Sequence, residues 1–129
     1  MIQQMLAMSS GGGGGKKGAS GWLTTSDWDG TAQTSKAVVT GLGFTPKHIA
    51  WFSVGNPVAA YHCNFRYDAD IDASKFYGNQ GTADRNSNGV SVGDNTLTNN
   101  LQSVDSDGFT LGYYVATYGS DYIYWIATE

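Results

Sequence analysis

Turn-forming residues interrupt this chain at short intervals, and they limit how long any regular element can be. Between them lie short runs rich in β-branched and aromatic residues, and beyond the N-terminal segment no window keeps a helical repeat. Many short strands joined by frequent turns are typical of two packed antiparallel sheets. The pattern predicts an all-β, antiparallel β-sandwich (jelly-roll-like) with a flexible N-terminal arm. The turn signals are Asp29-Gly30, Gly41, Gly43, Asn56-Pro57, Gly78-Asn79, Asn88-Gly89, Gly93-Asp94, Asp107-Gly108 and Gly119-Ser120.

The expected strands cover positions 37–40, 48–54, 59–67, 90–92, 101–104, 109–116 and 121–127. Both alternating faces of the run from 48 to 54 are apolar, which predicts a central strand. In the last run, Trp125 is expected to pack against Trp51 or Phe52 at the centre of the core.

Three segments are expected along the chain, and the first is an apolar anchoring arm over residues 1–8. Met1, Ile2, Met5 and Leu6 have the spacing of one face of a short helix, and Met8 adds to its apolar character. A helix this short is not stable alone in water. The arm is therefore predicted to dock onto a partner; the alternative is a frayed chain end.

Residues 9–21 are predicted to be a Gly/Ser-rich linker with an r.m.s. span of roughly 20 Å, and residues 22–129 the β-sandwich domain. The glycine run is not a phosphate-binding loop, because Ser10 stands where that motif needs glycine before Lys16. An apolar arm, a spacer and a globular body together indicate a tethered protein.

Charge and the length of the apolar runs argue against two classes of partner, nucleic acids and membranes. The formal net charge is −4 and charged residues make up 14 % of the chain, against a usual share of about 25 %. An acidic body repels phosphate backbones, so no nucleic-acid partner is expected. No run approaches the roughly 20 apolar residues of a membrane span, so no membrane association is expected either.

The strongest metal candidate in the sequence is the run Asp68, Asp70 and Asp72, whose alternating carboxylates resemble the start of a Ca²⁺ loop. Ala73 stands where that loop needs glycine, and Asn79 where it needs a bidentate glutamate. The favoured interpretation is a solvated acidic turn, so no metal and no cofactor are expected.

No catalytic residue is expected. Cys63 is the one cysteine, and the neighbouring His62 would point to the opposite face of a strand, so a thiol nucleophile is not favoured over a small buried side chain. His48 is far from His62 in sequence and has no carboxylate at ligand spacing. No pair of carboxylates is marked as a glycosidase pair, and the chain is predicted not to be an enzyme.

Tyrosines near the C-terminus are candidates for contact with a glycan or a protein. Tyrosine combines a rigid apolar ring with a polar tip, which suits stacking on sugars and packing at interfaces. The alternative is a set of half-buried strand tyrosines in an ordinary sandwich. The candidate contact residues are Tyr113, Tyr114, Tyr118 and Tyr122.

Three phrases of the sequence occur in a characteristic order: Gly41-Leu42-Gly43-Phe44-Thr45-Pro46, then Asp107-Gly108-Phe109, then the aromatic run from 122 to 127. Their order resembles a β-sandwich module of tailed-bacteriophage structural proteins, over roughly residues 30–129. The resemblance implies a non-enzymatic component of the virion, made in the host cytoplasm. It is compatible with capsid decoration, a collar protein, a tail fibre or a short appendage.

The resemblance also implies the partners. They would be other virion proteins of the capsid, collar or tail, and a homo-oligomer is expected because such modules often assemble symmetrically. The arm residues 1–8 would anchor the protein, and the sandwich would stand outside. The alternative function is a carbohydrate-binding sandwich for host attachment, in which the tyrosines stack on a surface glycan.

Overall fold

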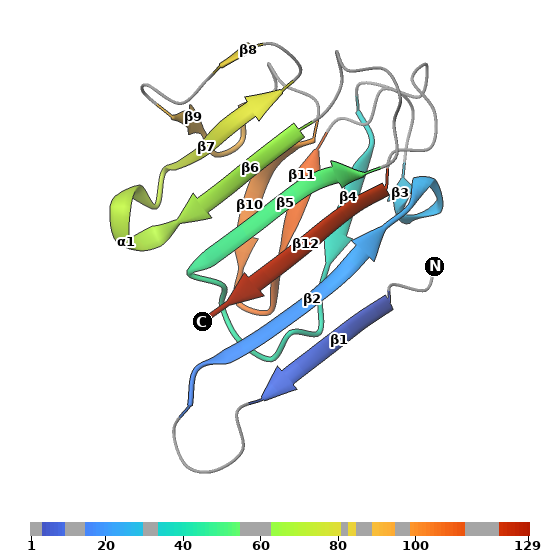
Figure 1. The fold of residues 1–129 in the computed structure, drawn as a ribbon, viewed down its shortest axis with the longest axis vertical. Coiled ribbons are helices and arrows are strands. Elements are labelled where there is room, and N and C mark those ends of the chain that lie inside the picture. Colours follow the sequence, from blue (N-terminus) through green and yellow to red (C-terminus); the bar gives the residue numbers. More distant parts are fainter. Residues whose placement is uncertain are drawn as a thin grey trace.

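The computed structural model describes residues 4–9, 15–29, 34–54, 63–80, 83–84, 89–94, 99–112 and 122–129. They form an all-β sandwich of two antiparallel sheets, which confirms the fold class predicted from the turn pattern. In Figure 1 the larger sheet lies in front of the smaller one.

The larger sheet has eight strands in the order β1-β2-β12-β5-β6-β7-β8, and β9 also pairs with β7. Strand β12, the last in the sequence, lies between β2 and β5, so segments from opposite ends of the chain are neighbours in the middle of the sheet. The strands are β1 (Gln4–Ser9), β2 (Lys17–Leu23), β5 (His48–Val54), β6 (Cys63–Asp68), β7 (Lys75–Gln80), β8 (Ala83–Asp84), β9 (Val90–Ser91) and β12 (Tyr122–Thr128).

The smaller sheet has four strands in the order β10-β11-β4-β3. These are β10 (Asn100–Asp105), β11 (Gly108–Gly112), β4 (Lys36–Val39) and β3 (Trp28–Asp29). A short 3₁₀ turn, η1 (Thr25–Asp27), precedes β3, and one helical turn, α1 (Ala69–Asp72), joins β6 to β7.

The core lies between the sheets, where alternate residues of each strand point inward. Trp125 of β12 faces Trp51 of β5 in the strand register, and both side chains are fully buried. This confirms the expected centre of the core. Phe109 of β11 meets Trp125 from the opposite sheet, with ring centroids 5.5 Å apart in an edge-to-face arrangement.

A buried hydrogen bond also joins the two sheets. Trp51 Nε1 of the larger sheet donates to the carbonyl oxygen of Asn99, which directly precedes β10 of the smaller sheet, over 2.8 Å. Asn99 has a φ of 58°, in the left-handed region that asparagine tolerates better than most residues. The bond gives the carbonyl group of Asn99 a hydrogen-bond donor in the protein interior.

The chain passes from the smaller to the larger sheet through a corner at residues 40–46, the first phrase of the resemblance. Gly41 and Gly43 have φ values of 83° and 74°, which ordinary side chains rarely adopt. Leu42 and Phe44 alternate with them and are buried in the core. The alternation of glycine and large apolar residues thus makes the turn and fills the end of the sandwich together.

The second phrase closes on this corner. Asp107, in the hairpin turn between β10 and β11, accepts hydrogen bonds through its carboxylate from the backbone N–H groups of Gly41 at 2.9 Å and Gly43 at 2.6 Å. Its carbonyl oxygen accepts from the N–H of Leu42 at 3.1 Å. These backbone hydrogen bonds, chiefly that from Gly43, lower the pKa of the Asp107 carboxyl. Two segments more than 60 residues apart therefore form one joint.

The N-terminal segment differs from the prediction in secondary structure. A helix was expected within residues 1–8, but residues 4–9 form β1, which pairs with β2 along its whole length. Strand β2 supplies β1 with backbone hydrogen-bond partners, whereas a helix this short is not stable alone in water. The helical spacing of Met5 and Leu6 was therefore a misleading signal.

Part of the predicted linker is also a strand. Residues 17–21 of the expected 9–21 segment belong to β2, between β1 and β12. Ala19 and Gly21 of β2 are buried and face Ala127 and Trp125. The small residues that resembled a linker leave room for the core tryptophan, so the sandwich begins before residue 22.

Candidate functional site on the outer face of the larger sheet

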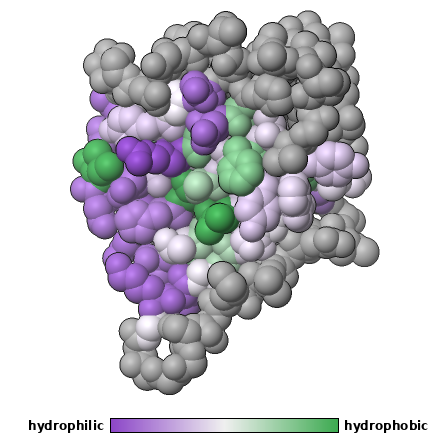
Figure 2. Space-filling model, viewed as in Figure 1, coloured by the Kyte–Doolittle hydropathy of each residue, from purple (hydrophilic) through white to green (hydrophobic). Residues whose placement is uncertain are grey.

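The face of the larger sheet that points away from the core carries the most distinctive surface of the described residues. Strand alternation places Trp22, Tyr122 and Ile126 there, with 38 %, 48 % and 40 % of their surface exposed. Figure 2 views this face and shows a hydrophobic patch near its middle, with hydrophilic residues on the β6 and β7 side. An apolar centre beside a polar border is typical of a binding surface.

Three aromatic side chains cross this face from strand to strand. Trp22 of β2 is the register partner of Tyr124 of β12, and Tyr124 is the partner of Phe52 of β5. Their ring centroids are 4.8 Å and 5.3 Å apart, and adjacent rings are tilted by 52° and 59°. We call Trp22, Tyr124 and Phe52 the aromatic ladder. Cross-strand ring contacts of this kind stabilise the pairing of the strands that carry them.

Two hollows adjoin the aromatic ladder, and they meet at Ala50 and Arg66. The larger has a volume of about 450 Å³, and its outward-facing lining includes Asn64, Tyr77 and Asn79. The smaller, of about 220 Å³, runs from Ile126 to His48 and Asp68. The methyl side chain of Ala50, between longer neighbours on β12 and β6, leaves the depression that joins them.

Arg66 is the cation of these hollows. Within the described part of the chain its guanidinium group has no ion pair and no hydrogen bond. Asn64 and Asn79, which are register partners on β6 and β7, are likewise exposed without a side-chain partner there. The hollow thus presents one charged fork and two amide groups to solvent.

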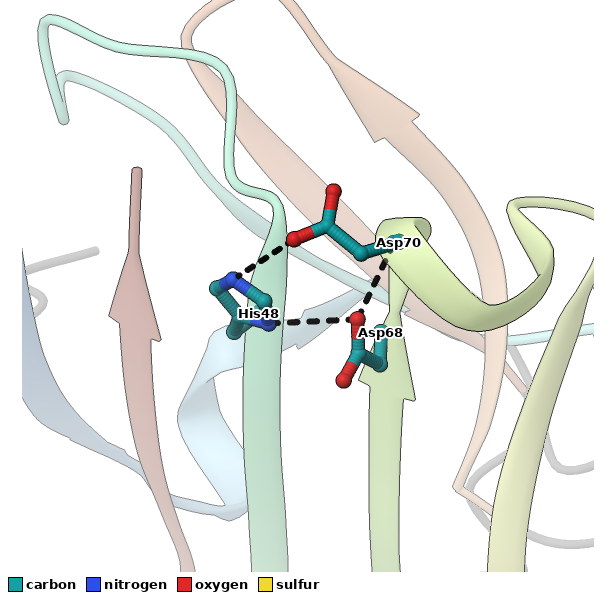
Figure 3. Close-up of polar contacts among 3 residues, drawn as sticks. All are labelled: His48, Asp68 and Asp70. Carbon is teal, nitrogen blue, oxygen red and sulfur yellow. Dashed lines mark hydrogen bonds and ion pairs between the residues drawn. The ribbon is translucent and has the colours of Figure 1, made fainter.

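A histidine and two aspartates lie together at the far end of the smaller hollow (Figure 3). His48 Nδ1 is 3.3 Å from Asp68 Oδ1, and His48 Nε2 is 3.6 Å from Asp70 Oδ2. Asp68 and His48 are register partners on β6 and β5, and Asp68 also caps α1 by accepting from the N–H of Asp70 at 3.0 Å. Neighbouring Tyr67 has its pKa raised, first by burial and then by the charge of Asp68.

This cluster could in principle hold a metal ion, since its donor atoms lie within 4.8 Å of one another. A metal would bind one imidazole nitrogen and both carboxylates. Here the two nitrogens of His48 face different carboxylates (Figure 3). That arrangement matches a surface histidine lying between two carboxylates better than a ligand set.

The run of three aspartates does not converge as a Ca²⁺ loop would. Asp68 and Asp70 face His48, whereas Asp72 accepts from the hydroxyl and the backbone N–H of Ser74 and lies 3.8 Å from Lys75 Nζ. The hydrogen bonds from Ser74 lower the pKa of Asp72. The three carboxylates therefore make separate contacts with residues near them at the turn around α1.

The structure locates only part of the residues predicted to make contacts. Tyr122 is half-exposed at the start of β12, on the same face as the aromatic ladder. Cys63 is buried on the same side of β6 as Phe65, as strand alternation predicted. Met5, Leu6 and Met8 lie within β1. The remaining residues singled out in the sequence lie outside the described part of the chain: Met1, Ile2, His62, Tyr113, Tyr114 and Tyr118.

Three features of this surface were not predicted from the sequence: the aromatic ladder, Arg66, and the contact of His48 with two carboxylates. All of them depend on the pairing register of the strands, which brings together positions from β2, β5, β6 and β12. The sequence shows which residues of each alternating strand point outward, but finding this surface also requires the order of the strands in the sheet. That order was not predictable, because β12 inserts between β2 and β5.

Comparison of the chain with protein-family models, curated proteins and solved structures finds no match. Among the described residues, no helix has the length and apolar character needed to cross a membrane.

Proposed function

We propose that this chain is a non-enzymatic structural protein of a tailed-phage particle, which displays its β-sandwich on the capsid, collar or tail. The observation that supports it is the joint between residues 40–46 and Asp107. Two of the three sequence phrases that resemble phage structural modules are the halves of this joint. These two phrases therefore belong to one hydrogen-bonded unit of this fold, and the proposal takes that unit as its support.

Attachment through the N-terminal segment is part of this proposal. Strand β1 is the edge strand of the larger sheet, and its outer edge has no strand partner within the described residues. An edge strand offers a row of backbone donors and acceptors to an extended segment of another protein. Residues 1–9 would thus bind a virion protein in one of two ways: by pairing β1 with an extended segment of that protein, or by burying apolar side chains against it. A homo-oligomer is compatible with either way of binding.

Density-gradient purification of phage particles tests the proposal. The intact chain, supplied during infection, is expected to sediment with the particles, and a chain lacking residues 1–16 is expected to stay at the top of the gradient. Retention of near-ultraviolet circular dichroism by the shortened chain is the control for folding. An intact chain that does not sediment with the particles would contradict the proposal.

A carbohydrate-binding sandwich for host attachment is the second function, and the aromatic ladder favours it. Exposed aromatic rings on a sheet face can stack on the apolar faces of sugars. Affinity electrophoresis in gels that contain host-surface polysaccharide tests this function. Retardation of the intact protein that Trp22→Ala weakens is expected, and free migration of the intact protein would count against it.

A further inference from the structure

We infer that the hollow between β5, β6 and β7 binds a carboxylated sugar of a glycan, with Arg66 pairing with its carboxylate. The aromatic ladder would hold the adjacent part of the glycan. This inference rests on the second function above, glycan binding, and names its ligand class. It does not depend on attachment to a particle.

The positive charge of Arg66 favours an anionic ligand. In an acidic chain, Arg66 stands at the junction of both hollows, and no carboxylate among the described residues pairs with it. The nearest aspartate along the same face of β6, Asp68, lies against His48 instead. A guanidinium group presents paired N–H donors that match a carboxylate in a bidentate arrangement. The free cation therefore complements an anionic group on the ligand.

The side chains around Arg66 favour a sugar over a simple anion. Asn64 and Asn79 border the larger hollow, and each amide can donate and accept hydrogen bonds, as neighbouring hydroxyl groups of a sugar require. Tyr77, the register partner of Arg66, adds a half-buried aromatic ring. The carboxylate would point toward this amide side of Arg66, away from Asp68.

The dimensions agree with one sugar unit beside a longer chain. A hollow of about 450 Å³ is within the usual range for small-molecule sites, roughly 300–1,000 Å³. Ala50 in its wall is two residues from Phe52 on the same face of β5, so the hollow leads onto the aromatic ladder. A glycan could therefore contact Arg66 and the ladder at once.

Binding of the purified protein to three carboxylated polysaccharides tests the inference: polygalacturonate, alginate and polysialic acid, each beside its methyl-esterified form. Titration calorimetry is expected to show tighter binding of at least one acid form than of its ester. Arg66→Gln should lower the affinity for that acid form by about 10- to 100-fold, the usual effect of losing a charged hydrogen-bond partner. It should leave the affinity for the ester nearly unchanged.

Lys36→Gln is the matched control, because it removes one exposed positive charge from the smaller sheet, far from the hollow. It is expected to change the affinity less than twofold. Equal binding of acid and ester forms, or an acid affinity that Arg66→Gln does not lower, would overturn the inference while keeping glycan binding. Binding of none of the polymers would overturn it too, and the particle-sedimentation result would still stand separately.

Discussion

Asp107 shows how a single exposed carboxylate can organise a fold. Its oxygens accept the N–H groups of Gly41 and Gly43, and its carbonyl accepts that of Leu42, so one residue satisfies three donors of a tight corner. Such backbone donors have few other partners when the chain turns sharply. The corner and the hairpin are therefore expected to form or open together.

The lowered pKa of Asp107 makes the stability of this joint depend on pH. Because the pKa is lower in the folded protein than the unfolded value of about 3.9, its contribution is complete above that value. It is lost as the pH falls through the lower folded pKa. The difference in free energy of unfolding between the parent and Asp107→Asn should therefore shrink between about pH 7 and about pH 3.

Urea unfolding at several pH values measures this difference, and Asp105→Asn, two residues away, is the control. Asp105 accepts only from the Ser103 hydroxyl among the described residues, so its substitution should show a smaller effect. A difference for Asp107→Asn that stays constant over the whole pH range would rule out the charged joint.

Gly41 in the corner and Gly108 at the start of β11 are both required, but for different reasons. A Cβ on Gly108 would collide with the carbonyl oxygen of Val39, a backbone atom that cannot move aside without disturbing β4. A Cβ on Gly41 meets nothing within 4 Å, and only its positive φ is unfavourable. Gly41→Ala should cost about 1–2 kcal/mol, and Gly108→Ala clearly more. Equal loss of stability in chemical denaturation would show that the close approach is not real.

Among the strands, β12 does most to unite the larger sheet, because it pairs with both β2 and β5. Trp125 on its inner face lies between Gly21 and Trp51 in the register and packs against Phe109 of the other sheet. Through strand pairing and this ring contact, Trp125 therefore links β2, β5 and β11.

Removal of this ring should be costly. Trp125→Ala is expected to lower the free energy of unfolding by about 3–5 kcal/mol, because it leaves a cavity at the centre of the core. Ile126→Ala, at the next position but on the outer face and 40 % exposed, should cost about 1 kcal/mol. Denaturant titration of the two variants checks the contrast, and a Trp125→Ala protein with parental stability would contradict this packing.

The strands show which parts of the fold the sequence could reveal. The expected run from 48 to 54 matches β5, because two apolar faces and flanking turn residues mark a central strand. Strand β7 was missed because Gly78-Asn79 was read as a turn. Gly78 lies within β7, where an added Cβ would collide with the carbonyl oxygen of Asn64. A glycine needed for close backbone approach is indistinguishable from a turn glycine in one sequence.

The binding surface was even less predictable than the strands. The tyrosines chosen from the sequence share a local run, whereas the aromatic ladder draws one ring from each of three strands that are far apart in the chain. A search for local runs of aromatic residues finds these tyrosines and misses the aromatic ladder. Only the order β2-β12-β5 places Trp22, Tyr124 and Phe52 side by side.

In the complete sandwich, the apolar core and the hydrogen bond from Trp51 to Asn99 hold the sheets together. Trp51→Phe keeps a large ring but leaves the buried carbonyl of Asn99 without its donor, which should cost about 1–3 kcal/mol. Trp22→Phe, on the exposed outer face, is the control and should stay within about 0.5 kcal/mol. Equal effects of the two substitutions in urea unfolding would show that the bond between the sheets does not contribute.

Among the described residues, the larger sheet packs one face on the core and leaves the other uncovered, with the edge strand β1 at the N-terminal side (Figure 1). This arrangement suits a displayed module, since attachment at β1 leaves the aromatic ladder and the Arg66 hollow accessible. The proposed particle function and the proposed glycan binding are thus compatible in one protein.

Immunogold electron microscopy of purified phage particles, with an antibody raised against residues 22–129, tests the proposed display most directly. Gold is expected on intact particles. Labelling across the head would indicate a decoration protein, and labelling at the neck or tail would indicate a collar or fibre protein. Intact particles without gold, when the same antibody binds the free protein, would contradict external display on the virion.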